Sequence, residues 1–391
     1  MPANVQTVSY GGGSSGVSEG IKQVNPSMNT NPQVWQMAAG EEGRFYSDLF
    51  LKHDVMFLGP GDFGAYEPEV YRHAVQNGAA TKGIVDNIAS FHDNVKPGEI
   101  VLMRNGLKVV AIGIVADTGY EWNEAFDDVY GWDLQHARRV IWQEHLNDEI
   151  LRIQKTTPLF GSRKQMQTFT RVHDEPILKQ LRPLFSQFKT RDLKSLPLPL
   201  PKPLTLDEVG QQLFTRGVAN DAVEKVIRAI ERQRRLLGWY KKVGKESSRP
   251  TEHEVVAHTV LPLLLALGWS EQLLAIEWKK IDLAAFWKTP TQAENCVMVC
   301  EAKTRGHGLQ DVKEQAFDYV NRIKLTACRT VLLTDGGRFY LYRPDGAGVW
   351  LDQAAVGYLN VEKIRTDHFA PPGTNAIDAL VDLTPAAVCR A

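Results

Sequence analysis

The chain has 391 residues, with 45 Lys and Arg against 46 Asp and Glu and a formal net charge of −1. This charge excludes a uniformly basic nucleic-acid binder, and a content of 43% hydrophobic and 23% charged residues is typical of a globular protein of two or three domains. Four cysteines without CxxC spacing argue against a disulfide framework or a structural zinc site, and no apolar run is long enough to span a membrane. We therefore expect a cytoplasmic protein that makes no use of a membrane.

Residues 1–33 are rich in Gly, Ser and Asn and have almost nothing to bury, which predicts a flexible leader. Short apolar runs then alternate with turn signals over residues 34–151, and this pattern predicts a small β-rich domain. Residues 100–104 and 109–115 are rich in β-forming residues and flank Asn105-Gly106, a pair that favours a tight turn. A β-hairpin is therefore expected at the centre of this domain.

Residues 152–248 are predicted to form a basic linker with helices. Prolines alternate with other residues over 195–204, which prevents a helix and favours an extended spacer at a domain boundary. Apolar residues at helical spacing then predict two short helices over 206–242. The remaining segment, 249–391, reads as a helix at 251–269, strands around 276–287 and 295–300, a helix at 309–324, and strands at 330–333 and 338–343. This order predicts an α/β domain with a central mixed sheet and a C-terminal tail.

The near-neutral total charge conceals an uneven distribution. Residues 41–150 contain 9 basic and 19 acidic residues, whereas residues 151–250 contain 21 basic and 9 acidic ones. Lysine and arginine that neutralise phosphates supply sequence-independent affinity, so a polyanion is expected to meet the middle of the chain. A solvated helix face is the alternative explanation of the same cluster. The candidate nucleic-acid contacts are Arg232, Arg234, Arg235, Lys241, Lys242 and, in the loop after the second of the predicted strands, Arg305.

Charged residues interrupt two apolar strands of the last third. Asp282 lies in the run KKIDLAAF, and Glu301 and Lys303 end the run CVMVCEAK. Strand alternation places Glu301 and Lys303 on one face. Buried charges are costly unless they are paired or bind a metal, and two carboxylates with waters suit Mg²⁺ or Mn²⁺. Lys303 could then orient the attacking water or neutralise developing charge. The alternative is a surface Glu-Lys pair and a strand-end Asp without a metal.

These residues resemble the PD-(D/E)xK nuclease superfamily, and within it the nuclease domains of type I restriction enzymes, over about residues 249–345. The matching features are an opening helix with an acidic residue, the Asp282 position, the ExK element at 301–303, a QxxxY element and the closing strands. The resemblance implies Mg²⁺ ligands at Asp282 and Glu301, and Gln315 and Tyr319 beside the site in contact with DNA. Two features depart from the family: Ile281 stands where Pro is common, and Glu254 competes with Glu252 for the acidic helix position. The complete set of predicted catalytic residues is Asp282, Glu301, Lys303, Glu252, Gln315 and Tyr319.

Residues 34–145 resemble the PUA-like β-barrels, which include the EVE, YTH and SRA domains, through the segment 95–115 with its Lys-Pro-Gly turn. The resemblance implies a reader module that accepts a modified base in an aromatic pocket, and aromatic stacking is how a flipped base is held. The acidic balance is unfavourable for gripping DNA and alternatively suits a sensor of a protein or a small cationic ligand. A DNA grip in this domain would require its arginines and lysines to gather on one face. The aromatic candidates are Trp35, Phe45, Tyr46, Phe63, Tyr66, Trp122, Phe126, Tyr130 and Trp132.

Together these observations predict an α+β and α/β multidomain protein: a PUA-like β-barrel, a basic helical linker and a restriction-endonuclease-like domain. The expected function is a Mg²⁺-dependent DNA endonuclease of the restriction or phage-defence type, with modified DNA as a candidate substrate. Cutting both strands requires two active sites, which predicts a homodimer, and no GxxxxGK[ST] motif for ATP occurs. The alternatives are a non-catalytic nucleic-acid sensor with a nuclease-like clamp, and an RNA nuclease.

Overall fold

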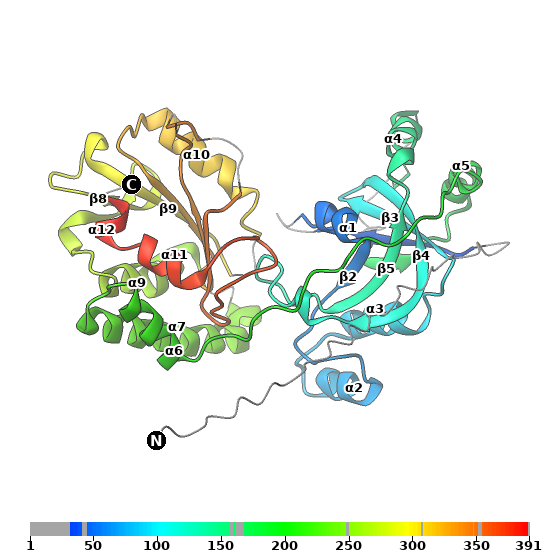
Figure 1. The fold of residues 1–391 in the computed structure, drawn as a ribbon, viewed down its shortest axis with the longest axis horizontal. Helices are drawn as coiled ribbons and strands as arrows, with labels where there is room; N and C mark the ends of the chain where they lie inside the picture. The colour runs from blue at the N-terminus through cyan, green and yellow to red at the C-terminus, as the bar shows by residue number, and fades with distance from the viewer. Residues whose placement is uncertain are drawn as a thin grey trace, which may run out of the picture.

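The computed structural model describes residues 32–40, 45–156, 159–160, 168–247, 250–305, 308–346, 348–350 and 354–389. Residues 1–31 of the predicted leader lie outside these ranges. Figure 1 shows two α/β units side by side, joined by an extended segment and by loops that meet between them. Among the described residues no helix is both long and apolar enough to cross a membrane.

Six strands form the sheet of the N-terminal unit, in the order β2-β5-β4-β3-β1-β6. β1 and β3 are parallel and all other neighbours are antiparallel. In the described chain the two edge strands do not pair with each other, so the sheet is open and mixed and the closed barrel expected from the sequence is not seen. The strands are β1 (Val34–Ala38), β2 (Val55–Leu58), β3 (Ile100–Asn105), β4 (Lys108–Trp122), β5 (His136–Trp142) and β6 (Phe169–Arg171).

The predicted central hairpin is confirmed as β3 and β4. Asn105 pairs with Lys108, so the loop is Gly106-Leu107, one residue later than expected, and Gly106 has a φ of 58°. Alternate β3 residues enter two separate hydrophobic clusters, with Ile100 in one and Val101 in the other. Because both faces are buried, the strand reads as a continuous apolar run. The covering helices are α1 (Ser47–His53), α2 (Pro68–Gln76), α3 (Lys82–Asp93), α4 (Asn147–Thr156) and α5 (Glu175–Phe185).

The N-terminal unit extends beyond the predicted boundary at residue 151. β6 pairs with β1, and α5 buries Ile177 and Leu181 in the cluster that contains Ile100. The chain then runs extended over 189–205, as the alternating prolines predict, and Figure 1 shows this green segment crossing from one unit to the other. It is fixed at both ends: Arg191 forms an ion pair with the buried Asp54, and the Leu204 amide donates to the Ile364 carbonyl at 2.7 Å.

The C-terminal unit has a second mixed six-stranded sheet, in the order β12-β11-β10-β9-β8-β7. Only β9 and β10 are parallel. The predicted central mixed sheet is therefore present, with an additional strand, β12, that the sequence pattern did not predict. The strands are β7 (Leu274–Trp278), β8 (Ile281–Phe286), β9 (Cys296–Ala302), β10 (Thr330–Thr334), β11 (Arg338–Tyr342) and β12 (Gly357–Asn360).

Helices α6 and α7 belong to this C-terminal unit and not to a separate linker. Val209 of α6 and Ile230 of α7 are fully buried in the same cluster as Leu332 of the sheet. α7 has 28 residues, so the second of the two predicted helices is long instead of short. Its apolar stripe packs against α6 and α9, while its charged stripe faces outward. The helices are α6 (Leu206–Thr215), α7 (Asn220–Ser247), α8 (Glu252–Val255), α9 (Leu261–Ala266), α10 (Val312–Ile323), α11 (Ala376–Asp382) and α12 (Pro385–Val388), with a π-helical turn at Val256–Val260 between α8 and α9.

An acidic loop of the N-terminal unit, residues 124–133, packs against the C-terminal unit. Asp128 Oδ1 accepts hydrogen bonds from Tyr358 Oη at 2.8 Å and Asn360 Nδ2 at 2.9 Å. Lys363 Nζ forms ion pairs with Asp127 and Asp133 at 2.6 and 2.7 Å. Part of the acidic excess of the first unit is therefore neutralised by the second.

The state of Asp128 predicts how this interface depends on pH. Burial raises the pKa of the Asp128 carboxyl from 3.8 to about 6, against the hydrogen bonds from Asn360 and Tyr358. The folded protein therefore favours the protonated, neutral carboxyl of Asp128 more than the unfolded chain does. The stability that this protonation contributes is fully present below the unfolded pKa of 3.8 and is lost as the pH rises through about 6. A change from 3.8 to about 6 corresponds to about 3 kcal/mol.

We expect Asp128→Asn to be more stable than wild type at about pH 8, by roughly half that margin at about pH 5, and nearly equal to it only below about pH 4. Asn retains the accepting oxygen, carries no charge and tolerates the positive φ of 62° at this position. Thermal unfolding of both proteins across this pH range measures the difference. A difference in melting temperature that does not change with pH would contradict the assignment.

Candidate functional site

The candidate site lies where β8 and β9 meet. Leu283 pairs with Cys300, which places Asp282 of β8 opposite the end of β9 that holds Glu301. Asp282 Oδ2 accepts a hydrogen bond from the Ala302 amide at 2.7 Å, and this bond fixes the carboxylate between the strands. Glu301 is only 5% exposed although its carboxyl group is ionisable. The antiparallel register thus brings together two carboxylates that are 19 positions apart in the sequence.

Lys303 lies on the same side as Glu301, which confirms the prediction from strand alternation. Its Nζ is 2.9 Å from Glu301 Oε1 and 3.6 Å from Glu252 Oε1. Its own amide donates to the Thr334 carbonyl at 2.8 Å, so β10 holds the backbone that carries it. The ammonium group therefore connects the end of β9 with the start of α8.

The two acidic residues of α8 have different partners. Thr251 caps the helix: its Oγ1 accepts from the Glu254 amide at 3.2 Å, and Glu254 Oε2 accepts from the Thr251 amide at 2.9 Å. This reciprocal pair is a capping box, which satisfies two free amides of the first turn. Glu254 is thus engaged in the cap, whereas Glu252 approaches Lys303.

Gln315 of α10 reaches the same carboxylate. Its Nε2 donates to Glu301 Oε1 at 3.0 Å and to Tyr319 Oη at 3.0 Å. The four-residue spacing puts Gln315 and Tyr319 on one helix face, as the sequence predicts. The guanidinium of Arg322 lies 5.0 Å from the centre of the Tyr319 ring. Side-chain contacts therefore link five of the six predicted catalytic residues, and Asp282 is held beside them through the Ala302 amide.

The donor set fits a hard divalent cation. Glu301 Oε2 is buried and has no hydrogen-bond partner among the described residues, which leaves one carboxylate oxygen available as a ligand. Across the same ranges, no three or more His, Cys, Asp and Glu side chains are grouped as a metal site. Mg²⁺ commonly uses only one or two carboxylates and keeps several waters, so Asp282 and Glu301 match that requirement.

Burial governs the ionisation of the group. It raises the pKa of Asp282, against the hydrogen bond from Ala302, and it raises the pKa of Glu301, against the hydrogen bond from Lys303. Burial alone would lower the pKa of Lys303, but its hydrogen bond to Glu301 and the nearby carboxylates raise it. Each charge in the group therefore depends on an opposite charge beside it.

Most of the predicted nucleic-acid contacts are engaged within the protein. Arg232 and Arg234 donate to the carbonyls of His258 and Val361, at 2.8 and 2.7 Å. Lys241 and Arg305 both form ion pairs with Glu362. The other two residues lie exposed on α7 and form no ion pair with any described residue: Arg235 and Lys242.

A second polar group lies in the N-terminal unit around the fully buried His136. Its Nδ1 is 2.8 Å from Tyr120 Oη, and its Nε2 is 2.9 Å from Tyr71 Oη and 3.2 Å from the Pro60 carbonyl. Since a carbonyl can only accept, Nε2 carries the proton, and Tyr120 donates to Nδ1. Burial lowers the pKa of His136 to about 4, which keeps the ring neutral.

Aromatic rings cover this histidine toward the surface. Tyr66 and Tyr120 both lie against His92, with ring centres 5.0 and 4.4 Å apart, and Trp122 lies 5.1 Å from His136. Tyr66 and Trp122 were expected from the sequence. The residues that sequence reasoning missed come from distant segments, so no local motif identifies them: Tyr71, His92, Tyr120 and His136.

Other candidates of the N-terminal unit are structural. Trp35, Tyr46 and Phe126 are buried in its core, and Trp132 stacks with Arg338 of the other unit at 4.1 Å. A DNA grip in this domain would need Arg104, Lys108, Arg138 and Arg139 on one face; Lys108 is exposed, whereas the three arginines are buried. They donate to the carbonyls of Gly106, of Phe91 and His92, and of Asp54, respectively. Any phosphate contact of this domain must therefore involve Lys108 or residues outside the predicted set.

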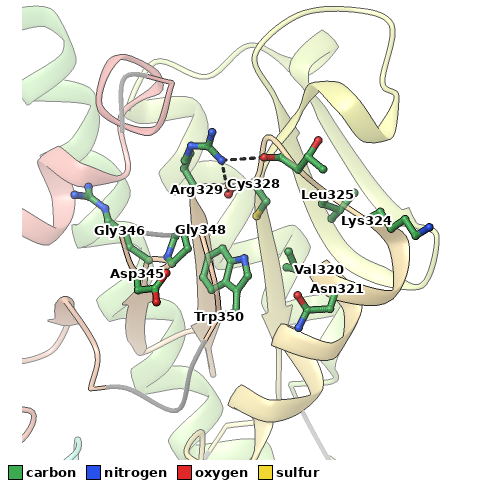
Figure 2. Close-up of a pocket in the computed structure, with 13 residues that line it drawn as sticks. Val320, Asn321, Lys324, Leu325, Cys328, Arg329, Asp345, Gly346, Gly348 and Trp350 are labelled. Atoms are coloured by element: carbon green, nitrogen blue, oxygen red, sulfur yellow. Dashed lines mark hydrogen bonds between the residues drawn. The ribbon is translucent and has the colours of Figure 1, made fainter.

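A cavity of about 760 Å³ lies at the other end of the C-terminal sheet. Figure 2 shows the indole of Trp350 among its lining residues, with Arg329 and Lys324 at its edges. Arg329 directly precedes β10, and its amide bonds to Val297 near the start of β9, whereas Glu301 lies at the end of that strand. The cavity is therefore separate from the carboxylate group.

Comparison with known proteins gives a match in the first unit only. Residues 35–173 match a family model described as a domain of unknown function, DUF8426, which covers less than half of the chain. The match spans the N-terminal sheet from β1 through β6. No curated protein and no solved structure matches the chain.

The different roles of the two α8 glutamates predict different effects on stability. Glu254→Ala removes the capping box and should lower the free energy of unfolding by about 1 kcal/mol. Glu254→Gln is the matched control, since glutamine can also accept the Thr251 amide. Glu252→Ala should have a smaller effect, because Glu252 is 43% exposed and its contact with Lys303 is long. Chemical denaturation measures all three; a larger loss for Glu252→Ala would contradict this assignment.

Proposed function

We propose that this protein is a Mg²⁺-dependent nuclease of the PD-(D/E)xK type that hydrolyses phosphodiester bonds in DNA and serves in restriction or phage defence. The observation that carries the proposal is the environment of Glu301. A carboxylate at the end of a buried strand contacts Lys303 and Gln315 through one oxygen and leaves the other oxygen without a partner in the described part of the chain. Asp282 from the adjacent strand completes a two-carboxylate donor set.

The sequence resemblance supports the same assignment independently. Its five elements occur in order over about 249–345, and residues from separate elements are in mutual contact around Glu301 and Lys303. A chance surface Glu-Lys pair would not require Gln315 to contact the same oxygen. The protein's own contacts thus favour a reaction centre over an incidental ion pair.

In the proposed reaction a water attacks phosphorus in line with the leaving oxygen, the P–O ester bond breaks, and the leaving oxygen takes a proton. Asp282 and Glu301 would hold Mg²⁺, which supplies Lewis-acid stabilisation of phosphate charge and acidifies water. Lys303 donates hydrogen bonds toward the water and the phosphate, where it orients the first and neutralises charge on the second. Glu252 and Gln315 keep Lys303 and Glu301 in place, at 3.6 and 3.0 Å.

We further propose that the N-terminal unit is a PUA-like reader of a modified base. The partly exposed rings of Tyr66, Tyr120 and Trp122 offer stacking surfaces, and the fixed tautomer of His136 orients the hydroxyl of Tyr120 beneath them. Stacking and hydrogen bonds to the base edge are the interactions that hold a flipped base. The protein would act as a cytoplasmic homodimer without ATP, with one active site for each strand.

A cleavage assay tests this proposal. Wild type should cut at least one of unmodified, methylated, hydroxymethylated or glucosylated DNA in Mg²⁺ or Mn²⁺, and Lys303→Ala should lose about 100-fold or more of that rate. Lys179→Ala, which removes an exposed lysine from α5, is the matched control and should cut like wild type.

Each outcome separates one alternative. Cleavage of RNA but of none of the DNA substrates would support an RNA nuclease, and binding without cleavage of any substrate would support the non-catalytic clamp. Equal cleavage of modified and unmodified DNA would refute the proposal that the N-terminal unit reads a modified base, but it would not contradict the nuclease proposal. Full activity of Lys303→Ala would refute the catalytic assignment itself.

A further inference from the structure

The hairpin between β7 and β8 has a turn made of two lysines. Trp278 pairs with Ile281, so Lys279 and Lys280 alone form the loop. Both have positive φ, 51° and 71°, and Glu277 just before them has a φ of 53°. Seven non-glycine residues in the described part of the chain have positive φ, and three of them lie in this hairpin. Backbone strain is therefore concentrated here.

Lysine is a poor choice for such a turn. A two-residue loop with positive φ at both positions favours Asn-Gly or Asp-Gly. In the left-handed region a Cβ lies too close to the following carbonyl oxygen, a cost that glycine avoids and that Asn and Asp offset by local hydrogen bonds. The sequence instead keeps two ammonium groups at positions where they destabilise the hairpin. Residues with strained backbone cluster at functional sites. Since lysine contributes a positive charge that Asn or Gly would not, we take this charge as the reason that lysine occupies the turn.

This charge is also available to a ligand. Lys279 and Lys280 are exposed, and neither forms an ion pair with the described residues. Lys279 Nζ lies 4.8 Å from the centre of the Trp278 ring, a contact that leaves its hydrogen-bond donors open. By contrast, Lys241, Arg305 and Lys363 are all engaged with carboxylates.

The turn lies at the edge of the carboxylate group. Lys280 precedes Asp282 by two residues, a separation of about 7 Å along the chain. On the other strand, Glu277 Oε1 is 3.0 Å from Nδ1 of His253, which directly follows Glu252 in α8. The turn is thus tied to the same two elements, β8 and α8, that supply Asp282 and Glu252.

We propose that Lys279 and Lys280 form a phosphate-binding turn that holds the nucleic-acid backbone next to the bond to be cut. The inference rests on the proposed nuclease function and adds a contact that lies outside the basic segment 232–242 and Arg305. Two exposed ammonium groups on one turn neutralise backbone phosphates without reading the base sequence. The strain of the turn is the stability cost of placing that charge beside the site.

The test is binding of a fluorescein-labelled DNA duplex, followed by anisotropy over a series of KCl concentrations without divalent cations. Lys279→Asn combined with Lys280→Gly installs the unstrained turn and removes both charges. Lys279→Arg combined with Lys280→Arg keeps the charges. Lys179→Gln combined with Lys202→Gln removes the same charge from α5 and from the extended segment, and is the matched control.

The Asn-Gly variant should bind about tenfold more weakly and lower the slope of log K against log salt by about 2, one for each phosphate that is no longer neutralised. It should also melt at a higher temperature than wild type. The Arg-Arg variant and the control should bind like wild type. Unchanged affinity and slope in the Asn-Gly variant, or no rise in its melting temperature, would overturn the inference and leave the nuclease proposal standing. Failure of wild type to bind either DNA or RNA would instead overturn the proposed function, and the inference with it.

Discussion

The constraint on which the C-terminal unit depends is the burial of Glu301. A charged carboxylate in the interior costs several kcal/mol unless opposite charge and hydrogen bonds compensate it. Lys303 and Gln315 supply part of this compensation through a single oxygen, and they come from the end of β9 and from α10. The second oxygen remains without a partner among the described residues. The end of β9, α10 and Lys303 are therefore arranged around the Glu301 carboxylate. A divalent cation bound at its second oxygen would compensate the rest of its charge.

At the interface between the units, as at Glu301, acidic side chains are compensated by basic side chains and hydrogen-bond donors. The acidic loop of the first unit meets Lys363 and Arg365 of the second, and Asp128 lies buried between Tyr358 and Asn360. Gly131 has a φ of 88°, and a Cβ there would lie 2.1 Å from Arg338 Cδ, so only glycine allows this approach. Basic residues of the second unit thus compensate part of the acidic excess of the first across this interface. Lys279 and Lys280 differ from these residues, because they are exposed and form no ion pair within the described ranges.

Local patterns predicted much of the fold and nearly all of the carboxylate group. Alternation in β9 placed Glu301 and Lys303 on one face, and the four-residue spacing in α10 placed Gln315 beside Tyr319. The domain boundaries could not be predicted in this way, because α6 and α7 join a hydrophobic core with residues such as Leu332, more than 100 positions away in the sequence. The same holds for His136, whose partners Tyr71 and Tyr120 are distant in sequence. The choice between Glu252 and Glu254 required the capping geometry of Thr251, which side-chain contacts reveal and composition does not.

The central claim is that Asp282 and Glu301 form a cation site, and a calorimetric titration of Mn²⁺ into the full chain tests it most directly. Wild type should bind the ion with heat that Mg²⁺ in excess suppresses. Glu301→Gln, which keeps the shape of the side chain but removes its charge, should weaken binding about tenfold or more. Glu294→Gln, an exposed residue before β9, is the matched control and should bind like wild type. Equal binding by the wild type and a folded Glu301→Gln variant would contradict the account.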